Sequence, residues 1–132
     1  MGKSSKEKEF LVYGGECFTI EWYFSEDGKS EALKFYSKLS DKQRRKFLML
    51  IKRMGDAGRI FDKTKFRNEG DKIYAFKPQP DRFLCFFVKD KKIIITNGFR
   101  KKQQKLPRKE KDKALTSKKD YEQRIKKGRY YD

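Results

Sequence analysis

The chain has 132 residues, enough for one domain with a modest core, and it carries a formal net charge of +17. It has no histidine and only two cysteines, without a CxxC pattern, which excludes histidine-based acid–base chemistry and histidine-ligated metal sites and argues against a disulfide scaffold. Residues 67–132 carry 21 Lys and Arg against 9 Asp and Glu, so we expect an anionic partner.

The N-terminal half predicts one strand followed by two helices. Residues 1–17 are expected to be an arm, and no apolar run has the length of a membrane span or signal peptide, which favours a cytoplasmic protein. Apolar and polar residues alternate over 18–24, as in a strand with one buried face. Helices are expected over about 30–39 and 41–57, the second with Ser40 as its N-cap. Its outer face carries the basic residues Arg44, Arg45 and Arg53.

The C-terminal half predicts a loop, three strands and a last helix. Residues 59–71 lack periodicity, whereas strands are expected at about 72–77, 82–88 and 92–97. The joins between these strands are short, which indicates an antiparallel meander. A helix is expected over 108–127, with a tail at 128–132. The predicted fold is a single α+β domain of order β-α-α-β-β-β-α, spanning 18–127, with a small antiparallel sheet.

Cations concentrate where the third strand of this meander gives way to the last helix. Arg100, Lys101, Lys102 and Lys105 lie within six residues, and so many like charges would position phosphates well, because phosphate accepts charge-assisted hydrogen bonds. In a meander, the end of strand 72–77 and the start of 82–88 share an edge with the end of 92–97. Lys77, Arg82 and the Lys101–Lys102 pair are therefore expected to converge on one phosphate.

Two motifs carry a resemblance to a known family. The first is Gly98-Phe99-Arg100-Lys101-Lys102 with Gln104-Lys105 and Pro107, between a strand and a helix. The second is Tyr74 with Lys77, followed by Arg82. Both motifs and the element order resemble the RelE/HigB-type toxins of bacterial toxin–antitoxin pairs, in their phage-derived branch. The resemblance departs at Ala75, where the family typically has Glu.

The resemblance implies a metal-independent endoribonuclease that cuts mRNA on the ribosome, uses the RNA 2′-hydroxyl as nucleophile and needs no cofactor. It also implies a cognate antitoxin, acidic or of the helix-turn-helix class. The implied catalytic residues are Lys77, Arg82, Lys101 and Lys102; substrate contacts are Lys65, Arg67, Tyr74, Arg100 and Lys105; and ribosome or antitoxin contacts are Arg44, Arg45 and Arg53.

The acid–base pair stays open at this point, because the chain has no histidine and no tyrosine near Pro107. Either a Lys or Tyr with a lowered pKa acts as the base, or positioning and charge stabilisation supply most of the catalysis. Two non-catalytic alternatives also remain: a ParE-like inhibitor that binds DNA gyrase, and a small phage-type nucleic-acid-binding protein.

Overall fold

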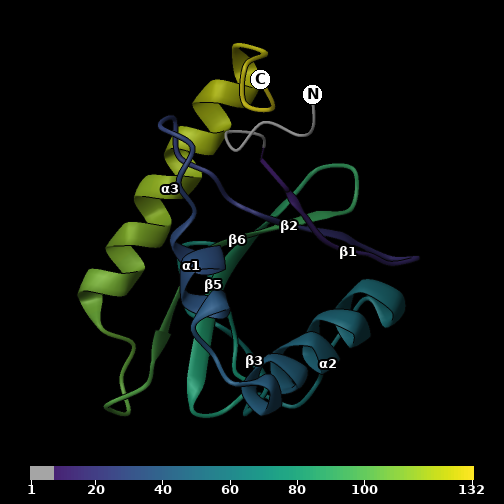
Figure 1. Ribbon diagram of the computed structural model, residues 1–132, viewed down its shortest axis with the longest axis vertical. Coiled ribbons are helices and arrows are strands. Elements are labelled where there is room, and N and C mark those ends of the chain that lie inside the picture. The colour runs from purple at the N-terminus through teal and green to yellow at the C-terminus, as the bar shows by residue number, and fades with distance from the viewer. Residues whose placement is uncertain (1–7) are drawn as a thin grey trace.

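A computed structural model describes residues 8–132 and confirms the predicted α+β class (Figure 1). A six-stranded sheet with the order β1-β2-β6-β5-β4-β3 forms the middle layer. The described strands and helices are β1 Leu11–Gly14, β2 Thr19–Trp22, α1 Glu31–Ser37, α2 Asp41–Ala57, β3 Phe66–Asn68, β4 Tyr74–Phe76, β5 Asp81–Val88, β6 Lys92–Arg100 and α3 Arg108–Lys126.

The sheet is mixed, so the expectation of a purely antiparallel sheet was wrong for one pair of strands. β2 runs parallel to β6, with Thr19 opposite Lys92 and Trp22 opposite Ile95, while all the other pairs are antiparallel. A parallel pair needs a long crossover connection, and here the crossover from β2 contains α1 and α2. The predicted meander is confirmed as β4-β5-β6.

Helices cover both faces of the sheet, whereas the sequence had predicted a single buried face for strand 18–24. α1 and α2 pack on one face, with Trp22, Phe47 and Ile95 in the core between them. α3 lies on the opposite side of the sheet (Figure 1), where Tyr23 and Ile94 belong to a second apolar cluster. Alternate side chains of β2 and β6 are therefore buried on opposite faces, which explains the continuous apolar run in β6.

α2 has the bounds predicted from its capping signals. The Ser40 side chain accepts from the backbone N–H of Gln43, whose side chain in turn reaches the Ser40 backbone, a capping box. The helix ends at Gly58, which has a left-handed backbone with φ of 81°. α1 is shorter than the predicted helix over 30–39, because Ser30 is its N-cap rather than its first residue and Lys38 is already its C-cap.

Residues 11–14, predicted to lie in an arm, form β1 against β2. The turn that follows packs on α2 through two glycines. A Cβ atom at Gly15 would lie 2.2 Å from the backbone carbon of Gly55, and the backbone N–H groups of Cys17 and Phe18 donate to the Gly55 carbonyl at 2.7 and 2.9 Å. Only glycine at position 15 allows so close an approach, so the hairpin is fastened to the helix by backbone contacts.

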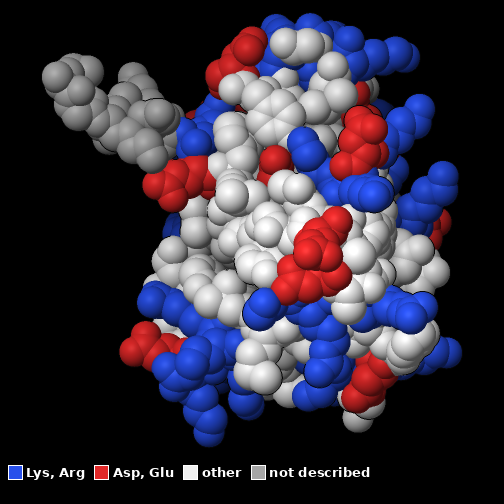
Figure 2. All heavy atoms as spheres, turned by 90° about the vertical axis from the view of Figure 1, so that its right-hand side faces the viewer, with Lys and Arg blue, Asp and Glu red and all other residues white. Residues whose placement is uncertain are grey.

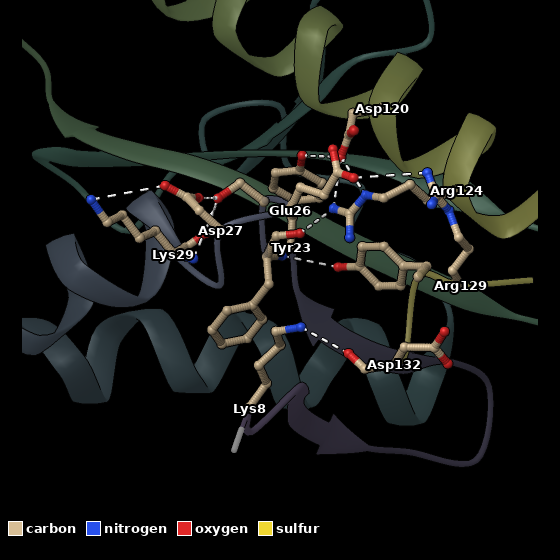
Figure 3. Close-up of polar contacts among 12 residues, drawn as sticks. Lys8, Tyr23, Glu26, Asp27, Lys29, Asp120, Arg124, Arg129 and Asp132 are labelled. Atoms are coloured by element: carbon tan, nitrogen blue, oxygen red, sulfur yellow. Dashed lines mark hydrogen bonds and ion pairs between the residues drawn. The ribbon is translucent and has the colours of Figure 1, made fainter. Parts of the chain in front are cut away.

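The C-terminal residues 128–132, expected to be a tail, contribute one side chain, Tyr130, to the core. Tyr130 is 1% exposed, and its hydroxyl accepts from the Phe24 backbone N–H at 2.9 Å. In Figure 3, the side chain of Arg124 extends from α3. Its guanidinium donates to the backbone carbonyl of Phe24 and also to the carboxylate of Asp120, which lies on α3 as well. Burial of the Tyr130 ring stabilises the fold, because an aromatic side chain removes a large apolar area from water. The segment after α3 therefore attaches the end of this helix to the sheet.

Two further boundaries differ from the sequence prediction near the pocket described below. The predicted loop over 59–71 contains β3, which pairs with β4 at the sheet edge. β6 extends to Arg100 rather than ending at 97, and its register against β5 shifts between Leu84 and Cys85, so that Thr96 is an extra, bulged residue. These features decide which cations face the pocket.

Candidate phosphate-binding site

The ends of β4, β5 and β6 and the loop over 101–107 enclose a hollow of about 340 Å³, which we call the cationic pocket. It opens on the face of the sheet that α3 covers. Six cations, one carboxylate and six uncharged residues line it: Arg67, Lys77, Arg82, Lys101, Lys102, Lys105; Glu69; Ala75, Phe99, Gln103, Gln104, Leu106 and Pro107. Cations in this number would repel one another unless an anion enters.

Strand register explains this gathering. Ala75 pairs with Arg67 on one side and with Leu84 on the other, and Arg82 pairs with Phe99. Residues paired across strands share a face, so these side chains point the same way as Leu84, which belongs to the α3-side cluster. The small Ala75 side chain is buried, and it leaves room that a larger residue would fill.

The position of Arg100 follows from the bulge at Thr96. An uninterrupted strand would put Arg100 on the same face as Ile94, toward α3. The extra residue reverses this alternation, so Phe99 faces the pocket and Arg100 lies on the opposite face. There the Arg100 Nε lies 3.6 Å from the carboxylate of buried Asp81. The structure therefore does not bring Arg100 into the pocket.

Arg82 is the most deeply buried cation of the pocket, with 6% of its surface exposed. Its Nη1 donates to the side-chain oxygen of Gln79 at 3.2 Å and to the carbonyls of Pro80 and Asp81 at 3.5 and 3.0 Å. Within residues 8–132, no carboxylate lies within 4.0 Å of its guanidinium nitrogens. Burial lowers its pKa, yet an arginine stays charged at neutral pH. Arg82 is thus a positioned cation with no carboxylate of residues 8–132 at ion-pair distance, although the charges of Glu69 and Asp81 act on it from farther away and partly oppose the lowering of its pKa.

Lys77 lies at the end of β4, half-buried beside Arg82. Burial lowers its pKa, and the nearby charges of Arg82, Arg67 and Lys101 lower it further, although Glu69 opposes them. Its Nζ donates to the Lys63 carbonyl at 3.2 Å. A lysine in such surroundings releases its proton more readily than a surface lysine, so Lys77 can serve in proton transfer.

Glu69 is the one acidic residue among those that line the cationic pocket, and the sequence analysis missed it. It follows β3 in a tight turn, where its backbone N–H donates to the Ile73 carbonyl at 2.8 Å. Gly70, Asp71 and Lys72 in this turn all have positive φ. Had the β3–β4 hairpin been predicted, Glu69 would have been placed beside the strand end that carries Lys77.

Other predicted site residues lie elsewhere. Tyr74 points toward the α2 side of the sheet, where its ring stacks on Phe66 with centroids 5.6 Å apart. Lys65 and Arg53 line a separate groove beside α2. Arg44 bonds the carbonyl of Tyr36 at 3.2 Å and is therefore a structural residue at least in part.

Basic residues also spread over the α2 side of the molecule. Figure 2 shows Lys and Arg side chains around a largely uncharged centre, with some carboxylates between them. Arg45 and Arg53 are exposed on the outer face of α2. This face is separated from the cationic pocket by the sheet.

Among the residues from 8 onward, no helix combines the length and apolar character needed to cross a membrane. In the same part of the chain, no three acidic or thiol side chains cluster in a way that could hold a metal ion. Cys85 is buried, and burial raises its pKa, so this thiol is a packing residue.

Comparison with known protein families gives a match over most of the fold. No curated protein sequence matches the chain. The model of the family described as phage derived protein Gp49-like (DUF891) matches residues 34–119. This span is more than half of the chain, begins in α1, ends in α3 and contains every residue that lines the cationic pocket. The protein therefore belongs to the phage-derived Gp49-like family.

Proposed function

We propose that this protein is the toxin of a toxin–antitoxin pair and that it cuts mRNA on the ribosome, in the cytoplasm, without a metal ion. Gp49-like proteins are commonly RelE-like toxins, which supports the toxin class. The single observation that carries the endonuclease assignment is Arg82, a buried guanidinium at the edge of a hollow lined by five more cations, with no carboxylate of residues 8–132 within ion-pair distance of it. A phosphate diester supplies the missing negative charge.

The lining residues suffice for attack by the RNA 2′-hydroxyl. Glu69 accepts the proton of this hydroxyl while its oxygen forms a bond to phosphorus. Arg82, with Arg67 and Lys101 beside it, stabilises the extra negative charge on the five-coordinate phosphorus. The bond from phosphorus to the 5′-oxygen then breaks, and Lys77 gives that oxygen its proton. The products are a 2′,3′-cyclic phosphate and a 5′-hydroxyl.

The α2 face supports a role in partner binding. Met49 is 70% exposed there beside Lys46 and Arg53, a basic rim around apolar surface. We propose that the antitoxin, an acidic or helix-turn-helix protein, or ribosomal RNA contacts this face through Arg45 and Arg53. The antitoxin would then restrain the toxin without entering the cationic pocket.

Mapping the cut ends tests the reaction. Purified protein is added to ribosomes programmed with a defined mRNA, and the fragment ends are identified chemically. We expect 2′,3′-cyclic phosphate and 5′-hydroxyl ends, and no cut at a site whose 2′-hydroxyl has been removed. Arg82→Ala, which keeps the pocket but removes its buried charge, should be inactive. Fragments with 5′-phosphates, or cutting at the 2′-deoxy site, would contradict the mechanism.

Growth arrest separates the proposed function from the gyrase alternative. Expression of the free protein should stop incorporation of labelled amino acids while DNA synthesis continues, because the target is mRNA. Loss of labelled thymidine incorporation before loss of amino-acid incorporation would favour a protein that binds gyrase. The same experiment with Arg82→Ala should show no arrest.

A further inference from the structure

A second hollow of about 470 Å³ lies next to the cationic pocket, and we call it the aromatic hollow. Its lining residues are Ile60, Phe61, Lys63, Phe66, Arg67 and Asn68, from β3 and the segment before it. Arg67 lines both hollows, so the two form a continuous surface around the sheet edge. A chain whose phosphate occupies the cationic pocket can therefore continue past Arg67 into the aromatic hollow.

Phe61 is the residue in this hollow that the fold does not use. It is 81% exposed, more than any other large apolar side chain of residues 8–132, and it belongs to neither core cluster. The Arg59 guanidinium carbon lies 5.1 Å from the centre of its ring. An exposed aromatic ring held beside an arginine offers a planar apolar face with a cation next to it, which is a surface suited to a nucleobase.

The charges around Phe61 favour nucleic acid over a protein partner. Arg59, Lys63 and Arg67 are positive. Asp62 is the acidic residue of this segment, and it is engaged locally, because it accepts from the backbone N–H and the hydroxyl of Thr64 at 2.9 and 2.6 Å. The combination of stacking surface and backbone-neutralising cations is typical of sites for single-stranded nucleic acid.

We propose that the aromatic hollow binds the base of a nucleotide adjacent to the cut phosphate, that Phe61 stacks on this base, and that Arg67 contacts the phosphate between the two hollows. The proposal rests on the function proposed above. Stacking on a phenyl ring tolerates every base, so this subsite adds affinity and positions the strand, and it does not select a sequence.

A double-mutant cycle between protein and RNA tests the contact. The protein variants are Phe61→Ala, Phe61→Trp and, as a matched control, Leu11→Ala, which removes an exposed apolar side chain at the opposite edge of the sheet. The RNAs are a short mRNA and two versions with an abasic nucleotide immediately 5′ or 3′ of the cut. Single-turnover cleavage on programmed ribosomes is measured against protein concentration. Anisotropy measures binding to the same RNAs made uncleavable by a 2′-deoxy nucleotide.

On intact RNA, Phe61→Ala should raise the half-saturating protein concentration roughly ten-fold, within the range expected for one lost base–aromatic stack. Phe61→Trp, which keeps an aromatic ring, should bind at least as tightly as the wild type, and Leu11→Ala should match the wild type. With the abasic nucleotide at one of the two positions, wild type and Phe61→Ala should bind equally. The proposal is overturned if Phe61→Ala binds intact RNA like the wild type, or if its defect is equal on all three RNAs.

Arg82→Ala, measured in parallel, separates this inference from the proposed function. If Arg82→Ala loses cleavage but Phe61→Ala behaves as wild type, the endonuclease assignment stands and only the base subsite fails. If Phe61→Ala instead weakens antitoxin binding while RNA binding is unchanged, the aromatic hollow is a protein-docking surface. A wild-type protein that neither cuts nor binds RNA overturns both.

Discussion

Glu69 and Lys77 differ from the arginines of the cationic pocket in their ability to accept or donate a proton near neutral pH. An arginine stabilises negative charge but does not exchange its proton near neutral pH, whereas a carboxylate accepts protons and a lysine with a lowered pKa donates one. The charge of Arg82 lowers the pKa of Lys77, and the charge of Glu69 raises it. In the proposed reaction, this pair would therefore carry out the two proton transfers, and the remaining cations would contact the phosphate.

The first prediction tests these two roles separately. Glu69→Gln should cut about 10²- to 10⁴-fold more slowly, as expected for loss of a general base, yet bind uncleavable RNA at least as tightly, because a negative charge near phosphate has been removed. Lys77→Ala should also cut slowly, and RNA with sulfur in place of the leaving 5′-oxygen should restore its rate, because a thiolate leaves without a proton. The same RNA should not restore Glu69→Gln.

The proposed role of Lys77 as an acid determines how the rate should change at alkaline pH. Its pKa is lowered, so the acid form needed for catalysis is lost at a lower pH than for a free lysine. The wild-type rate should fall on the alkaline side, and this fall should be absent in Lys77→Ala. If the sulfur-containing RNA restores the rate of Glu69→Gln, Glu69 rather than Lys77 is the acid. If the alkaline fall persists in Lys77→Ala, Lys77 is not the group that loses its proton.

Asp81 provides the second prediction. It is fully buried, its Oδ1 has no hydrogen-bond partner among residues 8–132, and Gln43 reaches its Oδ2 at 3.3 Å. Burial raises the pKa of this carboxyl, although Arg100 opposes the rise. A carboxyl with a higher pKa in the folded state than in the unfolded state destabilises the fold as pH rises from the unfolded pKa to the folded pKa. The loss is about 1.4 kcal/mol for each pH unit between those two pKa values.

Asp81→Asn removes this titration, so in urea titrations its stability relative to the wild type should increase as pH rises from about 4, the unfolded pKa of aspartate, until Asp81 has ionised in the folded wild type. At pH 7 the variant should be at least as stable as the wild type. Asp112→Asn, an exposed carboxylate on α3, is the matched control and should show no such trend. A loss of more than about 2 kcal/mol at pH 7 would mean that attraction to Arg100 outweighs the cost of burial.

At the scale of elements, the β1–β2 hairpin is joined to α2 by backbone contacts at Gly15 and Gly55. The third prediction is that Gly15→Ala lowers the free energy of unfolding by about 1–3 kcal/mol or more, because the added methyl group meets the Gly55 backbone at 2.2 Å. Gly14→Ala is a matched control next to it, since a Cβ there meets no described atom within 4 Å, and it should stay within about 0.5 kcal/mol. Equal effects of the two changes in urea titrations would refute this account.

The elements that the sequence predicted well are those with strong local signals. α2 has a capping box and a terminal glycine, and its bounds were predicted correctly. The short strands β1 and β3 were missed, because three or four residues with mixed polarity carry no clear period and are fixed by pairing with a neighbouring strand. The burial of Tyr130 was missed for a similar reason, since its partners Phe24 and Arg124 come from elsewhere in the fold.

The site was predictable in part from the meander. Short joins between β4, β5 and β6 place Lys77, Arg82 and the Lys101–Lys102 pair at one edge, and all four line the cationic pocket. Arg100, predicted as a substrate contact, lies outside the pocket because the bulge at Thr96 reverses the facing of every later side chain of β6. A bulge cannot be recognised from the alternation of polar and apolar residues in the sequence. Glu69 depended on β3, which was not predicted.

At the scale of the whole molecule, the positive charge is divided between two faces of the sheet, for which we propose different roles. The cationic pocket on the α3 side gathers six cations around the buried Arg82, an arrangement suited to chemistry at one phosphate. The α2 side carries exposed cations such as Arg45, free to contact phosphates of a large RNA without fixed geometry. Under the proposed function, the first kind of charge should affect the rate of the cut, whereas the second should affect how strongly the protein docks and how docking depends on salt.

The fourth prediction compares one arginine from each face. Arg82→Ala should lower the maximal rate of mRNA cutting on programmed ribosomes by about 10²- to 10³-fold, as loss of one donor to the transition state does, with little change in docking. Arg45→Ala should leave the maximal rate unchanged but raise the protein concentration needed, and it should reduce the slope of log affinity against log salt by roughly one unit if Arg45 contacts a phosphate. Arg45→Ala should keep the wild-type unfolding midpoint to within a few degrees, because its exposed side chain forms no ion pair in the described part of the fold. Arg82→Ala loses three hydrogen bonds of a buried side chain, so its unfolding midpoint is measured first and its rate is compared well below that temperature. If Arg45→Ala abolishes toxicity while Arg82→Ala remains fully toxic, the cationic pocket is not the reactive site, and a protein that acts by binding through α2 becomes the better description.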